Sequence, residues 1–211
     1  MLSTTSAASG KSADLLGSRE IKHVVVLGAN GAMGLGSGAL FTTAVPRVTF
    51  LARTKEKADG GLAAAVKMVR SSTVANRVDT GSYDADFDRV VAEADLIFEA
   101  VTEQLDLKQQ FFDRIDAVRR PDSIVATVTS GLSINQLAEG RSDSFRKNFL
   151  GLHFFNPPNV ILGTEQIAGD QRLTCEQGAC KRDRRAPPNE LSVFKHLRLP
   201  PGTAPDAWPA R

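Results

Sequence analysis

The amino-acid sequence predicts an α/β protein built on a doubly wound parallel sheet. Short apolar runs rich in β-branched residues alternate with helical patterns from Ile21 to about Gly169. Several of these runs are almost continuously apolar, which is typical of parallel strands covered on both faces. A cluster of glycines follows the first run, and a chain of 211 residues with 42% hydrophobic content has enough apolar mass for one such domain.

The elements can be taken in chain order. An apolar strand is expected at 21–27, and a tightly packed helix of small residues follows its glycine cluster. Further strands are expected at 47–54, up to 101, at 123–130 and at 148–155, and further helices at 55–72, from 87, at 106–120 and at 133–140. The helix at 106–120 has the clearest apolar face, and Pro121 follows it as a stop.

Composition excludes several classes of function. The net charge is +2, and lysine and arginine form no basic helix or aromatic-interleaved patch in the main body, so no nucleic-acid partner is expected. No apolar run is long enough to cross a membrane, and Cys175 and Cys180 match no metal or redox spacing, so a cytoplasmic protein without a metal is expected. Residues 1–20 lack the apolar core of a secretory signal and are expected to form a disordered leader.

The glycine cluster predicts a phosphate-binding turn of the Rossmann type. Gly28, Gly31 and Gly34 lie between the first strand and its helix, and Met33 stands between the last two. A strand that turns on glycines into a helix N-terminus offers backbone N–H groups to a pyrophosphate. The spacing is one residue longer than G-x-G-x-x-G, and a plain structural turn is the alternative.

The end of the second expected strand bears on the choice of dinucleotide. An acidic residue usually stands there and binds the adenosine ribose hydroxyls of NAD. This chain has Ala52 followed by Arg53, and an arginine suits the 2′-phosphate of NADP. NAD is the first expectation and NADP stays open, and Arg53 as a solvated loop residue is the alternative.

Four segments carry a resemblance to a known family. They are "GAMGLG", "ADLIFEAVTEQLDLKQQFFDRID", "ATVTSGLSINQLA" and "GLHFFNPPNVILGTEQI". From Val24 to about Ile167 the chain resembles the NAD-binding domain of the L-3-hydroxyacyl-CoA dehydrogenases of fatty-acid β-oxidation. The His-Phe-Phe-Asn-Pro run is the most specific match.

The resemblance implies three catalytic residues. His153 matches the catalytic base, Glu165 its partner twelve residues on, and Ser130 the serine that holds the substrate hydroxyl. The pairing is chemically reasonable, because a neutral imidazole can take a hydroxyl proton while a carboxylate on its far nitrogen fixes the tautomer. Taken alone, His153 is a satisfied core histidine and Ser130 an ordinary strand-end hydroxyl.

The resemblance also implies cofactor contacts at Glu103 and Lys108, which match a pair beside the nicotinamide-side ribose. As bare residues they are a surface acid and a solvated lysine. The family usually reads Asn-Thr-Ser-Ser where this chain has Val128-Thr129-Ser130-Gly131, so Val128 cannot supply a side-chain amide to the cofactor.

Residues 170–211 break the pattern. They contain both cysteines, the only tryptophan and six of the ten prolines, with no helical periodicity. In the resembled family a helical domain follows at this place, so an irregular tail, possibly frameshifted, is expected after a domain at 21–169.

Two functions therefore stay open: a truncated NAD-dependent 3-hydroxyacyl-CoA dehydrogenase acting on an acyl-CoA, or a dinucleotide-binding remnant without turnover. An extended short-chain reductase is rejected, because the only tyrosine, Tyr83, has Phe87 where that class needs lysine. A face left uncovered by the absent domain predicts self-association.

Overall fold

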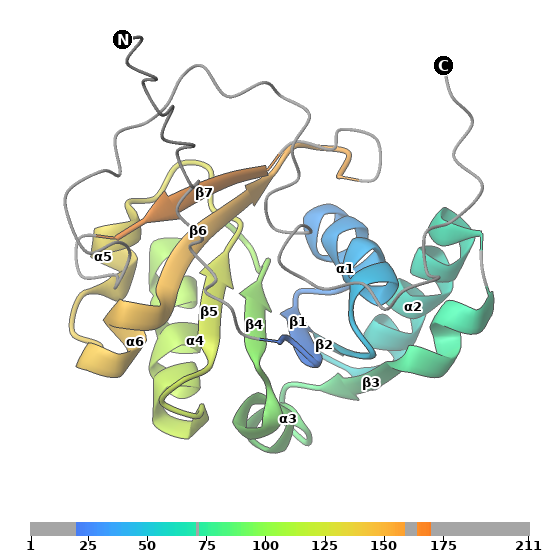
Figure 1. Cartoon of the computed structure of the whole chain (residues 1–211), viewed down its shortest axis with the longest axis horizontal. Helices are drawn as coiled ribbons and strands as arrows, with labels where there is room; N and C mark the ends of the chain where they lie inside the picture. Colours follow the sequence, from blue (N-terminus) through green and yellow to red (C-terminus); the bar gives the residue numbers. More distant parts are fainter. Residues whose placement is uncertain (1–19, 71, 159–163, 170–211) are drawn as a thin grey trace, which may run out of the picture.

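The computed structural model describes residues 20–70, 72–158 and 164–169, which form one seven-stranded sheet covered by helices (Figure 1). The strands are β1 (His23–Leu27), β2 (Arg47–Ala52), β3 (Val78–Ser82), β4 (Leu96–Glu99), β5 (Ile124–Thr127), β6 (Phe149–Phe154) and β7 (Thr164–Ala168). The helices are α1 (Ala32–Ala44), α2 (Lys55–Val69), α3 (Phe87–Glu93), α4 (Leu105–Val118), α5 (Ile134–Ala138) and α6 (Asp143–Asn148), with a 3₁₀ turn at Ser72–Arg77.

The strand order is β3-β2-β1-β4-β5-β6-β7, which confirms the doubly wound Rossmann-type sheet. The chain winds outward from β1 to β3 on one side and then crosses back to β4 on the other, so the order reverses between β1 and β4. The carboxyl ends of strands at such a reversal form a crevice where ligands bind in open α/β sheets.

Alternating side chains of the strands feed two separate cores. Val24 and Val26 of β1 belong to the cluster that packs on α1 and α2, whereas Val25 and Leu27 belong to the cluster under α3 to α6. All five residues of β1 are buried, as expected for a central parallel strand. The small side chains of α1 let this helix lie close to the sheet, and Gly38 directly faces the ring of Phe50.

The structure adds two strands and one α-helix that the sequence did not predict, besides the 3₁₀ turn at Ser72–Arg77, and it corrects one feature of the sheet. β3, α6 and β7 are new, and β7 pairs with β6 in antiparallel orientation, so the sheet is not parallel throughout. β4 also ends at Glu99, two residues before the predicted end. The predicted leader, apart from Glu20, and the predicted tail lie outside the described residues.

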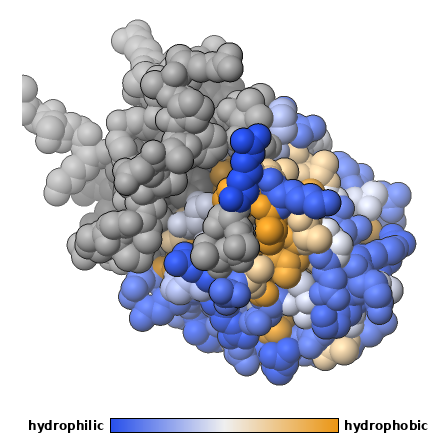
Figure 2. Space-filling model, turned by 90° about the vertical axis from the view of Figure 1, so that its right-hand side faces the viewer, coloured by the Kyte–Doolittle hydropathy of each residue, from blue (hydrophilic) through white to orange (hydrophobic). Residues whose placement is uncertain are grey.

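Among the described residues no helix is long and apolar enough to cross a membrane. The face shown in Figure 2 is mostly hydrophilic, with one area where hydrophobic side chains gather. Phe155, next to the end of β6, and Ile167, on the edge strand β7, are large hydrophobic residues with 37% and 41% exposure. Self-association stays a prediction.

Candidate functional site

The glycine turn between β1 and α1 is shaped for close contact with a phosphate. Gly28 has a φ of +78°, and a Cβ there would lie 2.4 Å from the carbonyl oxygen of Ala100. A Cβ on Gly34 would lie 2.2 Å from the oxygen of Gly28, so the third glycine lets α1 pack against the turn. Gly31 is the N-cap of α1 and has no side chain to accept from the first-turn N–H groups, which are available to an anion.

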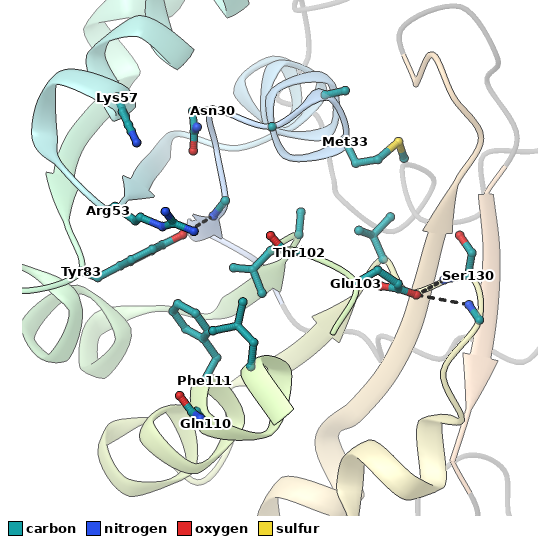
Figure 3. Close-up of a pocket in the computed structure, with 18 residues that line it drawn as sticks. Asn30, Met33, Arg53, Lys57, Tyr83, Thr102, Glu103, Gln110, Phe111 and Ser130 are labelled. Atoms are coloured by element: carbon teal, nitrogen blue, oxygen red, sulfur yellow. Dashed lines mark hydrogen bonds between the residues drawn. The ribbon is translucent and has the colours of Figure 1, made fainter. Parts of the chain in front are cut away.

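A cleft of about 920 Å³ opens along this turn at the carboxyl ends of β1, β2, β4 and β5. It runs from Arg53 and Tyr83 at one end, past Met33, to Glu103 and Ser130 at the other (Figure 3). Its wall includes the predicted cofactor residues Gly28, Gly31, Met33, Arg53 and Glu103. Gly34 instead packs beneath the turn.

The three predicted catalytic residues come together, His153 and Glu165 on two paired strands and Ser130 in the turn after β5. β6 and β7 pair so that His153 lies directly opposite Glu165, and the His153 Nδ1 atom is 3.5 Å from a Glu165 carboxylate oxygen. The Nε2 atom of the same ring lies 3.0 Å from the Ser130 hydroxyl, which follows β5. The twelve-residue spacing is therefore that of cross-strand partners in an antiparallel pair.

Packing on the opposite face fixes the direction of the histidine. Phe154 is buried against Phe41 and Phe98, with ring centroids 6.0 and 5.6 Å apart. Because successive side chains of a strand point to opposite faces, His153 points away from this cluster. Its side chain is 21% exposed, so the alternative of a core histidine is wrong.

Glu103 holds the turn that carries Ser130. One Glu103 carboxylate oxygen accepts from the Ser130 N–H at 3.0 Å, from the Gly131 N–H at 3.2 Å and from the Thr129 hydroxyl. Partial burial acts to raise the pKa of Glu103, but these hydrogen bonds and the Lys108 ammonium together hold that pKa below its ordinary value. The carboxylate is thus kept charged at this end of the cleft.

Lys108 lies behind Glu103 and is fully buried, so the alternative of a solvated lysine is wrong. Its ammonium donates to both oxygens of the buried Glu99, at 2.7 and 2.9 Å, and lies 3.2 Å from Glu103. Glu99 also accepts from the Thr127 hydroxyl and the Val101 N–H. Lys108 does not line the cleft in this structure, and it acts on the cleft through Glu103.

The other end of the cleft is formed by residues after β2 and β3. Arg53 follows Ala52, the last residue of β2, and Ala52 is buried. Tyr83 accepts a hydrogen bond from the Gly28 N–H at 2.8 Å, and its ring packs edge-on against Phe111 at 4.9 Å. Burial raises the pKa of Tyr83 to about 12, so this phenol is neutral.

Sequence reasoning missed several residues of the cleft. Tyr83, Lys57 and Phe111 line it, although Tyr83 entered only as a rejected catalytic tyrosine. No local pattern could have found Tyr83 or Phe111, because the turn after β3 and the helix α4 meet only in the fold. Lys57 carried one signal: it lies four residues after Arg53, in the first turn of a helix.

A glycine turn into a helix N-terminus, at the reversal of a parallel strand order and beside a long cleft, defines a dinucleotide-binding domain. Residues 23–173 match the family model described as "3-hydroxyacyl-CoA dehydrogenase, NAD binding domain". The chain belongs to this family, whose domain binds a nicotinamide dinucleotide.

Individual proteins that resemble this chain carry names of the same family. The mitochondrial hydroxyacyl-coenzyme A dehydrogenase of Sus scrofa is 31% identical over 180 residues, covering 79% of this chain and 55% of that protein. A probable 3-hydroxyacyl-CoA dehydrogenase of Deinococcus radiodurans is 28% identical, covering 72% and 46%. The crystal structure of a (S)-3-hydroxybutyryl-CoA dehydrogenase from Ralstonia eutropha superposes with a TM-score of 0.64 at 27% identity, covering 72% and 56%. The chain thus spans about half the length of these relatives.

Proposed function

We propose that this chain is the dinucleotide-binding and proton-transferring part of an L-3-hydroxyacyl-CoA dehydrogenase of fatty-acid β-oxidation. It would interconvert an L-3-hydroxyacyl-CoA and the 3-ketoacyl-CoA. The observation that carries the proposal is the contact chain Ser130–His153–Glu165, which lies beside the end of the dinucleotide cleft where Glu103 stands. The names of the relatives support the acyl-CoA substrate.

The geometry of the histidine suits proton removal from a hydroxyl. Glu165 lies beside Nδ1, which favours the tautomer with its proton on that atom and leaves the Nε2 lone pair free to accept. The Ser130 hydroxyl lies 3.0 Å from Nε2, so a substrate hydroxyl placed beside both atoms would donate to His153 and accept from Ser130. The Glu165 carboxylate would then stabilise the imidazolium that forms.

The cleft fits the cofactor that this reaction needs. The glycine turn offers first-turn N–H groups for the pyrophosphate, and the charged Glu103 oxygens at the far end can accept from ribose hydroxyls. A bound nicotinamide dinucleotide supplies the hydride acceptor for the carbon that carries the hydroxyl. Val128 lines the same end and offers no amide, so the backbone and Glu103 would position the ring.

The test is the reduction of acetoacetyl-CoA with NADH or NADPH, which is monitored through the loss of absorbance of the reduced cofactor. His153→Ala should lower kcat by about 10²–10⁴-fold, the usual contribution of a general acid–base residue. The Kd of the reduced cofactor should stay unchanged in this variant, because His153 does not line the dinucleotide cleft. Equal turnover in both proteins would refute the role of His153.

The same assay decides the alternative of a remnant without turnover. Wild-type protein that binds a dinucleotide and gives no ketone reduction would be such a remnant. Wild-type protein that binds neither dinucleotide would overturn both functions.

A further inference from the structure

Two basic side chains lie together at the end of the cleft next to β2, here called the adenosine end, because the second strand of a Rossmann domain ends at the adenosine ribose. Arg53 follows β2, and Lys57 lies in the first turn of α2. Both line the cleft together with Asn30 of the glycine turn, and Figure 3 shows the three at the same end. This end is remote from Glu103 and Ser130.

Neither cation has an ion-pair partner within residues 20–70, 72–158 and 164–169. The neighbouring charges of α2 are occupied elsewhere: Lys55 pairs with Asp59 at 2.9 Å, and Asp59 also accepts from Thr80. Glu56 is exposed, lies off the cleft, and bonds its own backbone N–H and the Thr54 hydroxyl, which lowers its pKa. The adenosine end therefore has two unpaired positive charges.

The position that selects NAD holds no carboxylate. In Rossmann domains an acid at the end of the second strand accepts the adenosine ribose hydroxyls and repels a 2′-phosphate. Here that position is Ala52, which is fully buried. Among the described residues that line the cleft the acidic one is Glu103, and it is held at the opposite end by the N–H groups of Ser130 and Gly131.

We propose that Arg53 and Lys57 form a phosphate subsite for the 2′-phosphate of the adenosine ribose, so that the domain prefers NADP(H) to NAD(H). The inference rests on the dinucleotide binding of the proposed function. The guanidinium of Arg53 offers a planar set of N–H donors that matches phosphate oxygens, and Lys57 adds a second charge. Asn30 can donate from its amide to the same group.

The first experiment uses fragments that need only the adenosine end. The full chain is titrated calorimetrically with 2′,5′-ADP and with 5′-ADP, and then with NADPH and NADH. The expected result is tighter binding of 2′,5′-ADP and NADPH by about 10- to 100-fold, the worth of one hydrogen bond to a charged group. Equal or tighter binding of 5′-ADP overturns the inference, and so does failure of both fragments to bind.

Single variants locate the subsite. Arg53→Gln and Lys57→Gln should each lose about tenfold for 2′,5′-ADP and leave 5′-ADP unchanged. Lys55→Gln is the matched control, because Lys55 is in the same helical turn but pairs with Asp59 away from the cleft, and it should change neither affinity. An equal loss for both nucleotides in Arg53→Gln overturns the phosphate contact.

The outcome is separable from that of the proposed function. A preference for 2′,5′-ADP without acetoacetyl-CoA turnover supports the subsite and refutes the dehydrogenase. Turnover with NADH at an efficiency equal to NADPH supports the dehydrogenase and refutes the subsite.

Discussion

Replacement of Lys108 by methionine tests the buried charge network behind the cleft. Lys108 and Glu99 both have fully buried side chains, and their three ionised contacts are at 2.7, 2.9 and 3.2 Å, the last to Glu103. Methionine fills a similar volume without a charge, so Lys108→Met removes the ammonium and leaves the Glu99 carboxylate buried without an ionised partner. Thr127 and Val101 would still donate to it.

The expected loss in the free energy of unfolding is about 3–5 kcal/mol, the cost of a buried charge that loses its partner. With a urea m-value of about 2 kcal/mol/M, the unfolding midpoint falls by about 2 M. The double variant Glu99→Gln/Lys108→Met should recover much of the loss, because no uncompensated charge remains. Lys67→Met, at an exposed lysine of α2, is the control and should change stability by less than about 0.5 kcal/mol.

The assay is urea unfolding followed by circular dichroism at pH 7. A loss below about 1 kcal/mol in Lys108→Met would show that the Glu99 carboxylate does not depend on the Lys108 ammonium, since solvent would then have to reach it. A double variant as unstable as the sum of the two single variants would refute the coupling between the residues.

Three further predictions follow from the site and the core. Gly31→Ala should keep the melting temperature, because its Cβ would lie 3.4 Å from the Gly28 oxygen, but it should weaken dinucleotide binding by about tenfold or more at the pyrophosphate. Gly34→Ala would place a Cβ 2.2 Å from the same oxygen and should therefore lower the melting temperature. An unchanged melting temperature in Gly34→Ala would contradict the close packing of α1 on the turn. Burial, and after it the charge of Arg47, lower the pKa of His23 below 6.5, so the unfolded chain takes up a proton first and the free energy of unfolding should fall as the pH drops below 6.5. In urea unfolding at several pH values, the free energy of unfolding of His23→Gln should fall less than that of the wild-type chain. Parallel curves of unfolding free energy against pH for the two proteins would rule out His23 as the cause. Glu165→Gln should lower kcat with acetoacetyl-CoA by about 10- to 100-fold and leave the KM for the cofactor almost unchanged. A change in the cofactor KM with an unchanged kcat would instead assign Glu165 a role in cofactor binding.

The central part of the fold could be predicted from the sequence because local signals agreed there. β1, the glycine turn and α1 combine an apolar β-branched run, glycines and small residues, and each signal points to the same unit. The amphipathic face of α4 was equally clear, with Phe112 and Ile115 fully buried.

The missed elements have weak local signals. β3 reads Val-Asp-Thr-Gly-Ser, and only Val78 and Gly81 are buried, because it lies at the sheet edge and is stabilised by its pairing with β2. β7 lies at the other edge and reads Thr-Glu-Gln-Ile-Ala, which has no apolar alternation. Such strands form because a neighbouring strand offers unpaired backbone groups.

The site was predictable only in part, for a similar reason. The spacing of His153 and Glu165 could be read from the family resemblance, whereas its cause, the antiparallel pairing of β6 and β7, depends on a strand that was not expected. The inward position of Lys108 could not be read, because a lysine on an amphipathic helix normally faces solvent and this one is buried by its contact with Glu99. Tyr83 reaches the cleft only because β3, which ends just before it, pairs with β2.

Isotope transfer from the cofactor to the substrate is the most direct test of hydride transfer by this chain. The wild-type chain would be mixed with acetoacetyl-CoA and with NADPH or NADH in which deuterium replaces both hydrogens at nicotinamide C4. The acyl-CoA product of a single turnover would then be measured by mass spectrometry. The expected product is a 3-hydroxybutyryl-CoA with one deuterium at C3, formed by the wild-type chain and not by His153→Ala. Bound cofactor with no labelled product from the wild-type chain would contradict hydride transfer by this chain.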